Sequence, residues 1–193
     1  MRLRTAGIVM RLTLVFDGIQ RIDYFSTERK HEMSEHKAII KWTHSQGEFL
    51  KGTYSREHIW TFDGGVTIPA SASPAAVRPP FSNPANVDPE EAFVASISSC
   101  HMLTYLYVAS RRGFELASYE DEAVGVMTKN ERGIPWVSSV VLRPRIVYTG
   151  AKIPTREEED QMHHAAHEQC FIANSVNTDI KVETGAVSSR SSD

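Results

Sequence analysis

The clearest hydrophobic pattern in the chain is a long apolar stretch near its middle. From Ala92 to Ala109 no residue carries a formal charge when histidine is counted as neutral. Asp88, Pro89 and Glu91 precede this stretch with an N-cap and a capping box, and two arginines and a glycine follow it. The pattern predicts a helix over 88–111. Because this helix is apolar on all sides, we expect it to be buried on all sides, at the centre of the fold.

Strand patterns lie on both sides of this helix. Before it they cover 37–44, 48–55, 58–62 and 66–73, with turns at SQG and DGG; after it they cover 116–130, 134–150 and 179–184. A second helix is predicted from Thr155, which forms a capping box with Glu158, to Cys170. Since strands and helices are segregated along the chain, we predict an α+β fold with antiparallel sheets.

The two ends of the chain differ from the rest. Residues 1–32 are expected to form an N-terminal extension outside the core fold, with Met33 as an alternative start. Residues 33–184 are expected to form one domain, and 185–193, small and polar, a flexible tail. The first segment is interrupted by Arg11 and lacks a signal-peptide cleavage site. No run reaches the eighteen apolar residues of a membrane span, so a cytoplasmic location is predicted.

Charge and cysteine content narrow the possible functions. The 193 residues carry a formal charge of −3, and no five Lys or Arg residues are consecutive. This distribution gives no sign of a nucleic-acid-binding surface. The only cysteines, Cys100 and Cys170, are far apart in the sequence. In a cytoplasmic protein this argues against a structural disulfide and leaves thiol chemistry, a metal site or simple burial.

Cys100 would need help from elsewhere in the fold in order to react. A thiol is nucleophilic as its thiolate, which a nearby cation or a helix N-terminus favours. Cys100 lies near the middle of the predicted helix, so no helix terminus is close. If this thiol is reactive, a cation from another segment must therefore approach it.

The stretch NVDPEEAFVASISSCHM, together with HEQCFIANSV, resembles the OsmC/Ohr family of osmotically induced and organic-hydroperoxide-resistance proteins over about 37–183. Members share an Asn/Asp-Pro-Glu helix start, a cysteine ten residues after that glutamate, and a second cysteine on a later helix. The resemblance implies an intertwined homodimer with active sites at the subunit interface. It also implies a thiol peroxidase that reduces organic hydroperoxides without a metal, haem or other cofactor. CFIANSV lacks the Cys-Pro of many members, which indicates a less typical branch.

The resemblance also assigns roles to the two thiols. Cys100 matches the peroxidatic cysteine, which becomes a sulfenic acid, and Cys170 matches the resolving cysteine, which forms a disulfide with it. Dihydrolipoyl groups or other thiols would reduce that disulfide. Glu90 matches the family glutamate. Ten helical residues span about 15 Å, so Glu90 would hold an arginine or serve the other subunit's site, or would simply be an acid favoured by the helix dipole.

Two arginines compete for the role that the family gives to a cation near the thiol. Arg56 precedes the DGG turn by about the family's interval, and from a hairpin it could bridge Glu90 and a thiolate. Arg78 lies in the proline-rich segment that leads into the helix. We favour Arg56, with Arg78 as its rival.

Two other functions remain open from the sequence. His163, His167 and Cys170 share one helical face, and Cys100 could complete four N/S ligands for zinc. Alternatively, the protein could bind a small apolar ligand without catalysis, in a cleft lined by aromatic side chains. The candidates for that lining are Trp42, Trp60, Phe81 and Trp136.

Overall fold

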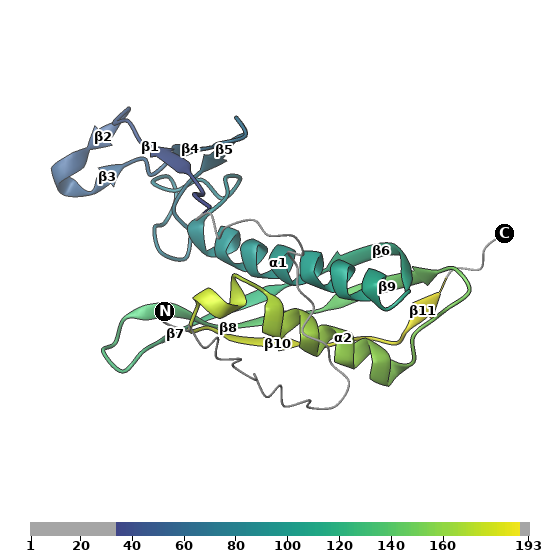
Figure 1. Ribbon diagram of the computed structural model, residues 1–193. Helices are drawn as coiled ribbons and strands as arrows, with labels where there is room; N and C mark the ends of the chain where they lie inside the picture. The colour runs from purple at the N-terminus through teal and green to yellow at the C-terminus, as the bar shows by residue number, and fades with distance from the viewer. Residues whose placement is uncertain (1–33, 190–193) are drawn as a thin grey trace, which may run out of the picture. The chain divides into compact units, whose positions relative to one another are not determined.

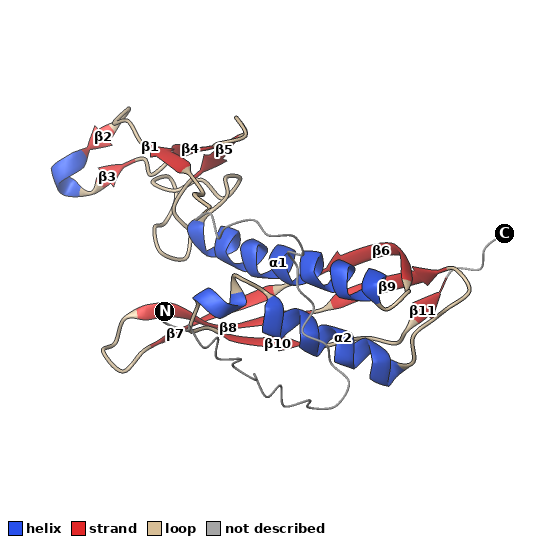
Figure 2. Cartoon of the chain, in the orientation of Figure 1, coloured by secondary structure: helices blue, strands red, loops and turns tan. Residues whose placement is uncertain are grey.

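The computed structural model describes residues 34–189, and the predicted extension over 1–32 lies outside them. The chain divides into a first unit, residues 1–36, and a second unit, residues 37–193, which holds all the described helices and strands. Figures 1 and 2 show their arrangement, and the α+β class predicted from the sequence is confirmed.

The strands before the first helix form two small antiparallel sheets. The larger has the order β1-β4-β5 and the smaller pairs β2 with β3. Between β2 and β3 a 3₁₀ turn, η1, interrupts the strand predicted over 48–55, and Gly52 closes that turn with a φ of +70°. The bounds are β1 Ala38–Lys41, β2 Gly47–Glu48, η1 Phe49–Lys51, β3 Thr53–Tyr54, β4 His58–Phe62 and β5 Thr67–Ala70.

Helix α1 (Pro89–Arg111) begins and ends as its sequence predicts. The side chain of Asp88 accepts the Glu91 N–H, and the Glu91 carboxylate accepts the Asp88 N–H, which completes the capping box. At the other end Gly113 adopts a φ of +77°, as the residue after a helix often does. The cap pattern therefore determines both ends of this helix.

The prediction that α1 is buried on all sides is wrong for the single chain. One face packs inward through Ile97, Tyr105 and Val108, but Leu103 is 56% and Leu106 36% exposed. By length and composition α1 could cross a membrane, the one helix in 34–189 for which this holds, but core helices of soluble proteins meet the same criterion. An apolar face that is open in one chain indicates a surface that another molecule can cover.

The remaining elements form two three-stranded sheets and a second helix, with strand orders β10-β8-β7 and β11-β9-β6. The β7–β8 hairpin and the β6–β9 pair are antiparallel, whereas β10 adds to β8 and β11 adds to β9 in parallel. The bounds are β6 Glu115–Asp121, β7 Val124–Lys129, β8 Pro135–Leu142, β9 Pro144–Thr149, α2 Arg156–Gln169, η2 Ala173–Ser175, β10 Asp179–Val182 and β11 Ser188–Ser189.

Within the described part of the predicted tail, up to Ser189, the chain forms a short strand, β11. Ser188 and Ser189 pair with β9, and the Ser188 hydroxyl donates to the Ile146 carbonyl. Upstream, the Arg156 guanidinium donates to the Gly185 carbonyl. Small polar residues predicted a loose segment, but backbone pairing to the open edge of β9 does not depend on large side chains.

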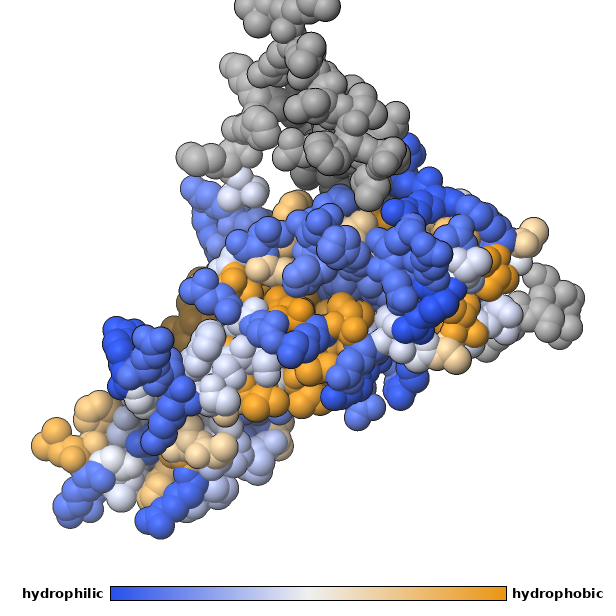
Figure 3. Space-filling model, turned by 90° about the horizontal axis from the view of Figure 1, so that it is seen from below, coloured by the Kyte–Doolittle hydropathy of each residue, from blue (hydrophilic) through white to orange (hydrophobic). Residues whose placement is uncertain are grey.

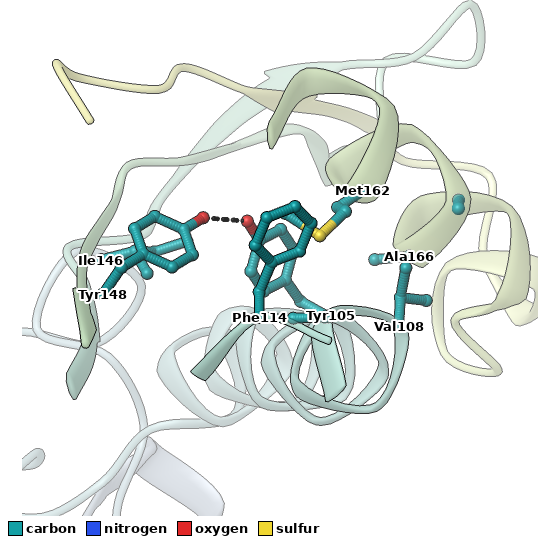
Figure 4. Close-up of a cluster of buried hydrophobic side chains, with 9 residues drawn as sticks. Tyr105, Val108, Phe114, Ile146, Tyr148, Met162 and Ala166 are labelled. Carbon is teal, nitrogen blue, oxygen red and sulfur yellow. Dashed lines mark hydrogen bonds between the residues drawn. The ribbon is translucent and has the colours of Figure 1, made fainter. Parts of the chain in front are cut away.

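Two hydrophobic clusters hold α1 against these sheets. The first joins α1 and α2 to β6 and β9 (Figure 4); its buried members are Tyr105, Val108, Ala109, Phe114, Ile146, Tyr148, Met162, Ala165 and Ala166. The second, under the N-terminal half of α1, contains Ile97, Val140 and Leu142. The packing of α1 on α2 therefore fixes how Cys100 and Cys170 lie relative to each other.

A buried polar pair adjoins the first cluster. His101 on α1 and His163 on α2 are almost fully buried, with stacked rings and a 3.0 Å hydrogen bond between Nε2 and Nδ1. Burial, helped by His167, lowers the pKa of His101 to about 4. Burial, helped by His101 and Arg156, lowers the pKa of His163 to about 3. Both rings are therefore neutral in the folded protein near pH 7.

This pair predicts how stability depends on pH. Well above pH 6.5, for example at pH 7.5, both histidines are mostly neutral whether the chain is folded or not. As the pH falls from about 6.5 towards 4, only the unfolded chain takes up the protons, so the free energy of unfolding decreases by up to about 1.4 kcal/mol per pH unit for each histidine. Urea unfolding at pH 7.5, 6.0 and 5.0 and constant protein concentration measures this slope.

The double variant His101→Leu/His163→Leu is the control, since replacing both partners leaves no buried polar group unpaired. It should lose less stability between pH 7.5 and 5.0 than the wild type, whatever its stability at pH 7.5. An equal slope in both proteins would show that the pair is not the source of the pH dependence.

Candidate active site

The structure brings Cys100 and Cys170 together. Cys100 lies in the middle of α1, and Cys170 forms the C-cap of α2. The two thiols are near enough for Cys100 to affect the pKa of Cys170, and the N–H of Ile172, two residues after Cys170, donates to Cys100 Sγ. Both are free cysteines; Cys170 is fully buried, and Cys100 is partly exposed. The fold thus brings close together two cysteines that are separated by 69 residues of sequence.

Backbone amides from the turn after α2 point at both sulfurs. The Ile172 N–H donates to Cys100 Sγ at 3.5 Å, and the Ala173 N–H donates to Cys170 Sγ at 3.4 Å. A hydrogen bond to the charged form of a group favours that form. Cys100 therefore has a donor that the sequence analysis did not foresee, because a backbone contact between segments leaves no side-chain pattern in the sequence.

The environments of the two thiols differ. Burial and the neighbouring Cys100 raise the pKa of Cys170 to about 11, although the Ala173 and Ile172 amides oppose the shift. Cys170 consequently keeps its proton near pH 7 and can donate it in a hydrogen bond to Cys100. In such a pair Cys100 is the sulfur that is reachable from solvent, and Cys170 is the protonated neighbour behind it.

Apolar side chains near Cys100 are open to solvent. Leu103, one helical turn further along α1, is 56% exposed, and Phe171, next to Cys170, is 65% exposed. On the face drawn in Figure 3, hydrophobic side chains lie open among polar ones. Among residues 34–189, apolar side chains therefore lie beside the thiol but leave it partly exposed.

Neither arginine reaches the thiols within the chain. The Arg56 guanidinium donates to the carbonyls of Gly52 (2.7 Å) and Tyr54 (2.5 Å) and lies 3.9 Å from the centre of the Tyr54 ring. Arg78 is exposed in the loop before α1, and within 34–189 no side-chain partner of it is recorded. The structure thus joins Cys100 to Cys170 but leaves Arg56 and Arg78 apart from them.

Glu90 lies at a different place on α1. Its Oε2 is buried and has no hydrogen-bond partner among residues 34–189. It lines a groove of about 710 Å³ between α1 and β6–β8, together with Val94, Ser98 and Tyr119. Ser98 and Cys100 project about 160° apart around the helix, so this groove faces away from Cys100 of the same chain.

The zinc alternative is not supported. Within the part of the chain that the structure describes, no group of three or more His, Cys, Asp or Glu side chains is arranged to hold a metal ion. His163, one of the proposed ligands, uses Nδ1 to contact His101. The i, i+4, i+7 spacing puts these side chains on one helical face, but they do not converge on a common point.

The aromatic side chains of the ligand-binding alternative are also dispersed. Trp42 donates to the Ser55 carbonyl and contacts Phe49 and Tyr54, whereas Trp60 donates to His58. Trp136 is on β8, and none of the four proposed residues lines the groove beside Glu90. They do not form one cleft.

Comparison with known proteins places the chain in a family. The family model described as OsmC-like protein matches residues 82–185, which include both cysteines, Glu90 and the whole of α1 and α2. The chain belongs to the OsmC-like protein family. The resemblance seen in the helix motif is thus confirmed. A comparison with curated proteins gave no match.

Solved structures show the same fold. An OsmC-like protein of unknown function from Vibrio cholerae is 52% identical, with a TM-score of 0.77 over 79% of this chain and 100% of that one. The organic hydroperoxide resistance protein OhrB of Bacillus subtilis is 22% identical (TM-score 0.56, 80% and 100% covered). An organic hydroperoxide resistance protein from Elizabethkingia anophelis is 18% identical (TM-score 0.56, 84% and 100% covered). At these last two identities the likeness concerns the fold alone.

Proposed function

We propose that this OsmC-like protein is a thiol peroxidase that reduces organic hydroperoxides through Cys100 and Cys170. The observation that carries the proposal is the proximity of a partly exposed thiol to a buried, protonated one. Membership of a family that includes organic hydroperoxide resistance proteins adds support. The apolar rim of Leu103 and Phe171 would favour alkyl peroxides over small polar oxidants.

The proposed cycle conserves atoms and electrons at each step. The Cys100 thiolate attacks the terminal oxygen of ROOH, the O–O bond breaks, and Cys100–SOH and RO⁻ form; RO⁻ takes a proton and leaves as ROH. The Cys170 sulfur then displaces hydroxide from Cys100–SOH, which gives the Cys100–Cys170 disulfide and water. Two reducing thiols, such as one dihydrolipoyl group, exchange with this disulfide and restore both cysteines while they become oxidised.

A second copy of the chain would complete the site. Ile39 and Ile40 are 66% and 58% exposed, and because neighbouring strand residues point to opposite faces, residues 34–189 cover neither face of β1. The open face of α1 and the unpaired Glu90 carboxylate also call for a partner surface. A homodimer would cover these surfaces and enclose Cys100 at the interface.

In the dimer, Glu90 would hold an arginine of the second copy near a thiol. A buried carboxylate oxygen without a partner is costly, and a guanidinium is its best-matched donor. Arg56 must leave its contacts with Gly52 and Tyr54 to take this role, whereas Arg78 is unengaged within the described chain. Both therefore remain in the proposal, as does a cytoplasmic location, where reducing thiols are abundant.

The first prediction concerns the two cysteines. One equivalent of cumene hydroperoxide should lower the free thiols of the reduced protein from two to none, and intact mass should fall by about 2 Da for an intrachain disulfide. Cys100→Ser should abolish turnover. Cys170→Ser should reduce one peroxide and then proceed to sulfinic acid at Cys100. Full activity of Cys100→Ser, or two free thiols after peroxide, would refute the mechanism.

The arginines give a second prediction. Removing the guanidinium that faces the thiolate should slow peroxide reduction at pH 7 by about tenfold and move the pH–rate profile to higher pH. Arg56→Ala and Arg78→Ala are compared by the pH dependence of the second-order rate with cumene hydroperoxide, and each is the other's control. If neither profile moves, neither arginine activates Cys100.

The dimer gives a third prediction. Leu103→Glu places a charge in the open apolar face of α1 and should dissociate the dimer. The molar mass measured by light scattering coupled to gel filtration should then fall from twice the chain mass of 21.6 kDa towards 21.6 kDa. Ile153→Glu, an exposed apolar side chain in the loop before α2, is the matched control and should leave the dimer intact. A wild-type protein that is monomeric at micromolar concentration contradicts the proposal.

A further inference from the structure

The side chain of Asn174 makes two hydrogen bonds in the turn that follows α2, where the Ser175 hydroxyl also donates to the Phe171 carbonyl. The Asn174 Nδ2 donates to the carbonyl of Glu168 at 3.0 Å and to the carbonyl of Cys170 at 2.9 Å. The Asn174 backbone N–H also donates to the Cys170 carbonyl, at 3.0 Å. Carbonyls at a helix C-terminus lack intrahelical partners, so these bonds both cap α2 and fold the chain back over its end.

This turn carries the amides that contact the sulfurs. Ile172 and Ala173 lie between Cys170 and Asn174, so the same turn fixes the directions of their N–H groups. On the described chain, the Ile172 amide is the one backbone donor recorded on Cys100 Sγ. Cys100 lies mid-helix, far from either end of α1. The Ile172 amide therefore supplies the free N–H donor that a helix N-terminus would otherwise present to a thiolate.

We propose that Asn174 is a positioning residue for Cys100, which it serves by holding the 170–174 turn so that the Ile172 N–H points at the Cys100 sulfur. The proposal rests on the peroxidase function proposed above. Asn is suited to the task because its planar amide has two N–H donors, which reach two carbonyls at once. The Ile172 N–H then stabilises the thiolate and leaves Cys170 free to react with the sulfenic acid.

Two variants test this role of Asn174, whose two side-chain hydrogen bonds to the Glu168 and Cys170 carbonyls are called the clamp below. Asn174→Ala removes both bonds, and Asn174→Asp keeps the shape but presents oxygens to the two carbonyls, so both should loosen the turn. Asn177→Ala is the matched control, because Asn177 is an exposed residue of the same loop, and its side chain has no bond recorded within 34–189. Circular dichroism verifies that each variant is folded.

Thiolate absorbance at 240 nm, followed against pH in the reduced full-length proteins, measures the lower of the two thiol titrations. This titration should move up by about 0.5–1 unit in both Asn174 variants and remain in place in Asn177→Ala. Single-turnover reduction of cumene hydroperoxide should be about three- to tenfold slower below that titration and should converge with the wild-type rate above it. A purely structural role would not produce this convergence.

The outcomes separate the two proposals. A wild-type protein that does not react with peroxide refutes the peroxidase function, and the absorbance titration still decides whether Asn174 controls the thiolate. A wild-type protein that reacts, with Asn174→Ala and Asn174→Asp titrating and reacting as it does, overturns the clamp and leaves the peroxidase function standing. An equal shift in Asn177→Ala also overturns the clamp, because it would trace the effect to the loop in general.

Discussion

The packing of α2 on α1 is the interaction on which the rest of the structure depends. Tyr105 and Met162 meet in the cluster between the helices and β9, and the His101–His163 pair joins the helices beside it. A neutral histidine pair must present matching donor and acceptor nitrogens, so it specifies the relative placement of the helices more narrowly than apolar contacts alone. Because His101 is next to Cys100 and His163 is two helical turns before Cys170, that placement also sets the contact between the thiols.

A single chain carries only part of a protected site. The two thiols and the amides that contact them are present within one copy. Among residues 34–189, however, Glu90 Oε2 has no hydrogen-bond partner and Cys100 remains partly exposed. The same chain exposes both faces of β1 and one face of α1. These features have one physical cause, which is that apolar and buried polar surfaces made for contact are present without the surface that they contact. A single assumption, that a second copy of the chain packs against these surfaces, accounts for all of them.

Local rules account for most of the fold that could be predicted from the sequence. The capping boxes at Asp88 and Thr155 and the glycine after α1 are short-range signals, and both helices begin where those signals lie. The burial of α1 within its own chain could not be predicted. An apolar helix has the same sequence pattern whether its own chain or another molecule packs against it. The zinc site proposed from the helical spacing is not supported for a related reason. Helical spacing shows which side chains share a face, but not whether they converge on one point. The thiol amides were missed because every residue has an N–H, and only the path of the chain determines where it points.

The asymmetry between the two thiols gives the proposed chemistry its direction. If both were equally exposed and acidic, either could meet the peroxide, and over-oxidation of one would compete with disulfide formation at the other. Burial keeps Cys170 protonated and away from oxidant, while its contact with Cys100 keeps it within reach of the sulfenic acid. Once Cys100 has been oxidised it no longer carries the negative charge that opposed ionisation of Cys170, and the Ala173 amide remains in place to stabilise the second thiolate. Oxidation of Cys100 to the sulfenic acid therefore favours the thiolate of Cys170, which then converts that sulfenic acid into the disulfide.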